Sequence, residues 1–62
     1  MTYEEAKKAF DRRDSVLLDG IEYRHINAII FRRKGSDRIV QLELQDIDAR
    51  SVTVADMEKV TA

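Results

Sequence analysis

His25 is the only histidine in the chain, which has no cysteine. A structural zinc site wants four nitrogen or sulfur ligands, and a histidine base needs a nucleophile and an orienting group. Ser15, Ser36 and Ser51 all lie near expected turns, where serine commonly makes local hydrogen bonds. We therefore expect no catalytic residue, no metal site and no cofactor. A minimal enzyme is kept only as the third of three functional alternatives.

Asp46-Ile47-Asp48 matches the opening of a calcium-binding loop. The rest of that pattern fails, because the fifth position is Arg50, the sixth is Ser51 in place of glycine, and the twelfth is Met57 in place of a bidentate glutamate. Aspartate is also a standard turn residue. The segment is therefore interpreted as a turn.

The charges are unevenly distributed along a chain whose net charge is −1. Residues 32–38 hold four basic residues and one acid, a net +3, whereas residues 43–59 hold five acids and two bases, a net −3. Such a basic tip suits phosphate contacts. It also suits the solvated end of a hairpin, and the pI of about 5.7 is low for an avid nucleic-acid binder. The candidate contacts for nucleic acid or another anion are Arg24, Arg32, Arg33, Lys34 and Arg38, with Arg12 and Arg13 as further cations.

Four apolar residues do not belong to the alternating set of side chains that is expected to face the core. Any of them that the helix leaves exposed would mark a partner site. A chain of 62 residues has a small core, to which self-association adds buried area. The first functional hypothesis is therefore a non-enzymatic interaction or adaptor module that binds a protein or itself. A weak nucleic-acid-binding accessory protein is the alternative, although the aromatic residues are expected in the core. The candidate partner interface is Leu17, Ile29, Ile39 and Ile47.

The first element expected to position these residues is an α-helix. Thr2 and Glu5 have the spacing of a capping box, and apolar residues recur at helical spacing from Tyr3 to Phe10. This pattern predicts a helix over Tyr3–Arg12, within a helical segment 2–13. A helix of this length is marginal alone, so its apolar stripe must lie on other elements.

A hairpin and a bent strand are predicted next. Asp19-Gly20 between apolar runs favours a type I′ turn, which joins Ser15–Leu18 to a strand starting at Ile21. The apolar alternation then changes phase between Tyr23 and Ile26. A bulge or sharp bend around Arg24–His25 would account for this change.

The remaining chain is expected to be further strands joined by turns. Alternation predicts a strand from Val40 to Gln45 and another at Val52–Val54. The predicted connections are a turn at Arg32–Asp37, a turn at Asp46–Arg50 and a single helical turn at Ala55–Lys59, after which Val60 returns to the sheet edge.

These elements predict one domain, residues 1–62, that is mainly β with one N-terminal α-helix. A bent antiparallel meander of four to five strands over residues 15–60 resembles a small SH3-like β-barrel. The expected core is Tyr3, Phe10, Val16, Leu18, Ile21, Tyr23, Ile26, Ala28, Ile30, Val40, Leu42, Leu44, Val52, Val54 and Val60.

At the level of sequence, most of the chain resembles a group of very small proteins of bacterial genomes, phages and mobile elements. The residues that carry the resemblance are Tyr3 to Phe10, Asp19 to Tyr23, Ile26 to Arg33 and Ser51 to Ala55. The resemblance implies a small cytoplasmic domain and supplies no activity, ligand or catalytic residue. No apolar run approaches the roughly 18 residues of a membrane span, so no membrane partner is expected.

Overall fold

The computed structural model describes all 62 residues. Strands form 52% of the chain, and one α-helix precedes them, which confirms a mainly β fold. None of the helices has the length and apolar character that a membrane crossing requires. The elements are α1 (Tyr3–Arg12), β1 (Val16–Leu18), β2 (Ile21–Tyr23), β3 (His25–Lys34), β4 (Asp37–Gln45), β5 (Val52–Asp56), the 3-10 turn η1 (Met57–Lys59) and β6 (Val60–Thr61).

Helix α1 begins with the predicted capping box. The Thr2 hydroxyl accepts from the Glu5 amide at 3.2 Å, and the Glu5 carboxylate accepts from the Thr2 amide at 2.8 Å. This amide hydrogen bond holds the pKa of Glu5 below its ordinary value. The helix buries Ala6 and Ala9. Their small side chains bring the helix close to the strands, so the expected core positions Tyr3 and Phe10 lie exposed at its flanks.

The six strands form two antiparallel sheets of three strands each, in the orders β2-β1-β6 and β3-β4-β5. The turn between β1 and β2 has positive φ at both Asp19 and Gly20, 52° and 77°, as a type I′ hairpin requires. At the other end of the chain, η1 turns the backbone so that β6 pairs with β1. Strand pairing closes no barrel.

The predicted bend at Arg24 connects the two sheets. Strand β2 ends at Tyr23 in the first sheet, and β3 begins at His25 in the second. The Arg24 amide donates to the carbonyl of Gln45 at 2.8 Å, which fixes the bend against the end of β4. The chain thus changes sheets within one residue.

The register also shifts, but further along the strand than predicted. An extra residue, Asn27, lies between the paired positions Ile26 and Ala28 of β3. Because a bulge moves the following side chains to the other face, Ile29 lies opposite the buried Leu42 and packs against the core. Ala28 and Ile30 were predicted to face the core, but they lie on the outer face of the sheet.

The core is small and consists of alanine and aliphatic side chains. On β5, Thr53 and Ala55 face inward because they lie opposite Leu44 and Leu42. The outer face of β3-β4-β5 therefore carries Val52 and Val54, which are 49% and 46% exposed, and their prediction as core residues is wrong. Ile21, at 59% exposed, is also outside the core. The buried residues are Ala6, Ala9, Val16, Ile26, Leu42, Leu44 and Val60.

Candidate functional site

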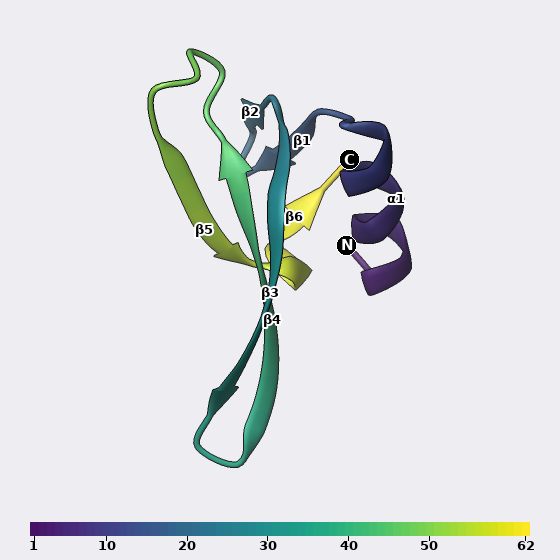
Figure 1. Ribbon diagram of the computed structural model, residues 1–62, viewed down its shortest axis with the longest axis vertical. Coiled ribbons are helices and arrows are strands. Elements are labelled where there is room, and N and C mark those ends of the chain that lie inside the picture. The colour runs from purple at the N-terminus through teal and green to yellow at the C-terminus, as the bar shows by residue number, and fades with distance from the viewer.

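The ends of β3 and β4 project from the rest of the fold as a long hairpin, here called the arm and defined as residues 31–40 (Figure 1). The predicted turn at Arg32–Asp37 is too long, because only Gly35 and Ser36 lie between the two strands. Gly35 has φ 63° and Ser36 has no positive φ, as in a type II′ hairpin turn. The arm lengthens the molecule to 36 × 22 × 19 Å. It presents an uninterrupted run of exposed residues, 31–38.

Cross-strand register divides the basic residues of the arm between two faces. Phe31 lies opposite Val40, and Arg33 lies opposite Arg38, on the face that continues the core side of the sheet. This surface is called the inner face of the arm. Arg32 and Lys34 project from the other side, the outer face.

The two faces differ in how their charges are compensated. On the outer face Lys34 lies opposite Asp37, a pair of unlike charges. On the inner face Arg33 lies opposite Arg38, and like charges directly opposite each other destabilise a sheet. The inner face therefore concentrates two guanidinium groups, which an anion placed between them would compensate.

An exposed aromatic ring lies next to this arginine pair. Phe31 precedes Arg33 by two residues on the same strand and is 67% exposed, contrary to the prediction that it belongs to the core. Its ring centroid lies 5.8 Å from that of Tyr3, with the planes tilted by 57°. Tyr3 thus supports the Phe31 ring from α1 and leaves most of its surface in solvent.

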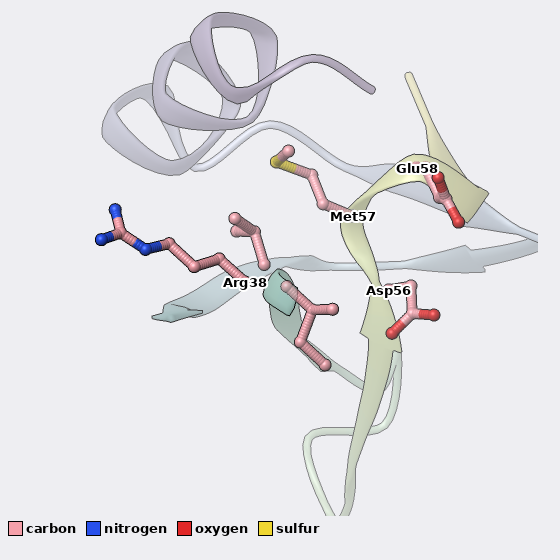
Figure 2. A pocket seen from close by; sticks show the side chains of 6 residues that line it. Arg38, Asp56, Met57 and Glu58 are labelled. Carbon is pink, nitrogen blue, oxygen red and sulfur yellow. The ribbon is translucent and has the colours of Figure 1, made fainter. Parts of the chain in front are cut away.

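Two hollows adjoin the arm. The larger, of about 520 Å³, is lined by three arginines and three apolar side chains, namely Phe31, Arg32, Arg33, Arg38, Ile39 and Val40. The smaller, of about 270 Å³, lies between the β4 side of the arm and residues 56–58. Figure 2 shows the Arg38 guanidinium pointing away from Asp56 and Glu58, so these carboxylates leave its charge free for a partner.

The remaining predicted cation, Arg24, lies apart from the arm. It is held against Gln45, at the far end of β4 from Arg38. Seven residues of extended strand separate the two positions, about 24 Å. Near that end, the guanidinium of Arg13 lies 3.3 Å from Nε2 of His25. The structure therefore places four of the five predicted basic residues on one hairpin, two on each face, and leaves Arg24 out.

The four residues of the predicted partner interface do not form one surface. Leu17 pairs with Glu22 and Thr61 in the first sheet, whereas Ile29 packs against the core. Ile39 lies on the outer face of the arm, and Ile47 lies in the loop beyond the other end of β4. Of these, only Ile39 lies beside the basic residues.

The predicted turn at Asp46–Asp48 has a structural role in the β4–β5 loop. The Ser51 hydroxyl donates to the Asp46 carboxylate at 2.7 Å, and the Asp48 amide donates to it at 3.2 Å. These bonds, the first above all, hold the pKa of Asp46 below its ordinary value. No three histidine, aspartate or glutamate side chains are grouped closely enough to hold a metal ion.

The opposition of Arg33 and Arg38 and the exposure of Phe31 were not predicted from the sequence. The signal that could have located the pairing is the two-residue turn at Gly35-Ser36, because its length fixes the register of the flanking strands. The exposure of Phe31 had no such signal. It follows from the projection of the arm beyond the helix and the first sheet.

Comparisons of the chain with models of protein families, with curated proteins and with solved structures find no match.

Proposed function

We propose that this chain is a non-enzymatic interaction module built on an SH3-like barrel that is open along one side. Support for that architecture comes from the element order, from β1 lying between β2 and β6, and from the segment bent at Arg24, which contributes to both sheets. The single turn η1 before the last strand fits the same arrangement. In this fold the strand ends and hairpins are free to bind a partner.

The partner is anionic, and the arm binds it. The observation that carries this proposal is the direct opposition of Arg33 and Arg38 on an exposed hairpin. A like-charge pair of this kind lowers stability when the arm is free and contributes favourably when an anion lies across it. Catalysis has no comparable support, because the larger hollow beside the arm is lined by arginines and apolar side chains alone.

Binding to polyanions over a range of salt concentrations tests the proposal. The wild type should bind at least one of single-stranded DNA, heparin and polyglutamate, with an affinity that falls steeply between about 50 and 200 mM salt. Replacing Arg33 and Arg38 together by Gln should abolish most of the binding. Lys7→Gln with Lys8→Gln removes the same charge from the exposed side of α1 and should leave binding nearly unchanged. Absence of binding to all three ligands at low salt contradicts the proposal.

A second candidate function is association with a protein or with a second copy of the chain through the outer face of β3-β4-β5. It rests on the exposed Val52 and Val54, which lie two residues apart on β5 and on the same face of the sheet as Ile39. Sedimentation velocity of the wild type should then show a concentration-dependent dimer, which Val54→Lys or Ile39→Lys disrupts. A monomer at high concentration removes this candidate.

A further inference from the structure

We infer that the anionic partner of the arm is single-stranded nucleic acid, with a base stacked on Phe31 and an adjacent phosphate held between Arg33 and Arg38. This inference rests on the proposed function of the arm as an anion-binding surface. It adds the class of ligand and an aromatic contact that general attraction between charges does not require.

The Phe31 ring has the properties of a stacking platform. It is 67% exposed although a buried position is usual for a phenyl group, and β3 fixes its place in the sheet. The Tyr3 ring supports it at 5.8 Å in a tilted arrangement. Proteins that bind single strands combine such rings with positively charged grooves, because every base has a π-face on which to stack.

The spacing of the ring and the arginines suits one nucleotide. Phe31 and Arg33 point to the same side of β3 and are separated by two residues, about 7 Å. One nucleotide can span this distance between its base and its phosphate. Arg38 lies directly across from Arg33, so two guanidinium groups approach the phosphate from neighbouring strands.

The adjoining hollow is large enough for such a ligand. Its volume of about 520 Å³ lies within the range of roughly 300–1,000 Å³ that small-ligand sites occupy. The inner-face residues that line it are Phe31, Val40 and the arginine pair. Cations and an apolar ring around one hollow match a ligand that has both phosphates and flat bases.

Other polyanions match this surface less well. A duplex presents its phosphates but keeps its base faces stacked inside, so it cannot use Phe31. An acidic peptide or a sulfated polysaccharide supplies charge without an aromatic face. The net charge of the chain is −1, but residues 32–38 of the arm carry a net +3, and Arg38 points away from Asp56 and Glu58 (Figure 2).

The experiment is a fluorescence anisotropy titration with a labelled single-stranded oligothymidylate of about twelve nucleotides, a length within the site sizes of OB folds that bind single strands. The same titration is run with a duplex of equal length, with heparin and with polyglutamate. The protein is the full chain, as wild type, Phe31→Leu, Phe31→Tyr, the Arg33→Gln Arg38→Gln double variant and the Lys7→Gln Lys8→Gln control. Leucine keeps apolar contact with Tyr3 but removes the ring, and tyrosine keeps the ring.

The single strand should bind more tightly than the duplex. Phe31→Leu should weaken single-strand binding about 5- to 150-fold, the range for loss of one stacked base, whereas Phe31→Tyr should bind as tightly as the wild type. Phe31→Leu should leave heparin binding and the salt dependence unchanged. The double arginine variant should reduce the slope of log affinity against log salt by about 0.7, because the two arginines hold one phosphate.

The outcomes separate this inference from the proposed function. If the duplex and heparin bind as tightly as the single strand and Phe31→Leu changes nothing, the arm binds anions but the nucleic-acid inference is overturned. If polyglutamate alone binds, the partner is an acidic protein segment and the inference is again overturned. If none of the ligands binds, the proposed function and the inference both fail.

Discussion

Arg33 and Arg38 lie directly opposite each other on an exposed hairpin, where an unlike pair would stabilise the sheet. Natural sequences depart from such local rules at functional sites, and this departure is the reason why we propose the arm as the binding surface. The sequence predicted that Arg32, Arg33, Lys34 and Arg38 cluster. It did not predict which of them share a face, because that depends on the register set by the turn.

Replacing Arg38 by Glu should therefore stabilise the fold while it removes binding. The new carboxylate would lie opposite Arg33, and we expect the free energy of unfolding to rise by about 0.2–1 kcal/mol at low salt. Salt should shrink this gain, because exposed charges are screened. Urea unfolding at low and high salt measures the effect. A loss of stability at low salt would contradict the placement of the two side chains.

At Asp46, the sign of the pH dependence follows from its lowered pKa. A carboxyl whose pKa is lower in the folded than in the unfolded state stabilises the fold above the unfolded pKa, and this contribution disappears as pH falls through the folded pKa. Asp46→Asn should lower the midpoint of thermal unfolding at neutral pH. The difference from wild type should vanish in acid, well below the ordinary aspartate pKa of about 3.9.

Thermal unfolding from neutral pH into acid checks this expectation, and Asp14→Asn, which removes an exposed carboxylate, is the matched control. A difference for Asp46→Asn that persists unchanged in acid would show that its hydrogen bonds with Ser51 and Asp48 do not depend on its charge.

Among the elements, those with strong local signals were predicted and those set by pairing were not. The capping box predicted α1, and Asp19-Gly20 predicted the first hairpin, because both depend on a few adjacent residues. The predicted phase of β3 was wrong because Ala28–Phe31 is apolar at both odd and even positions, so alternation cannot select a face. Only pairing with β4 shows that Asn27 is the extra residue.

The start of α1 offers a test at this scale. Thr2→Ala removes the side chain that accepts from the Glu5 amide, and loss of an N-cap costs about 1 kcal/mol of stability. Thr2→Ser keeps the hydroxyl and should lose little. Chemical denaturation of both variants measures the difference. Equal stability of Thr2→Ala and the wild type would show that helix capping contributes nothing to folding.

At the scale of the whole molecule, one small core holds α1 and the two sheets together. The core residues Leu42, Leu44, Val16 and Val60 were predicted, since they belong to strands with clear patterns. Val52 and Val54 alternate equally clearly, but the inward phase of β5 is set by its pairing with β4. A sheet with one uncovered face thus carries apolar side chains that lie outside the core. Composition alone cannot distinguish these residues from core residues.

One matched pair of substitutions distinguishes the two faces. Val60 is fully buried, so Val60→Thr places a hydroxyl in the core and should destabilise the fold by about 1–3 kcal/mol. Val54→Thr makes the same chemical change on the outer face and should change stability by no more than about 0.5 kcal/mol. Similar losses at both positions, measured by urea unfolding, would contradict the assignment of the outer face.

The most direct test of the arm as the binding surface is a map of amide chemical shifts during titration of the isotope-labelled chain with single-stranded oligothymidylate. We predict that the shift changes concentrate in residues 31–40 and at Tyr3, and that Arg24 and the first hairpin stay unchanged. Saturating changes centred on the outer face of β5, or no changes at low salt, would contradict the account.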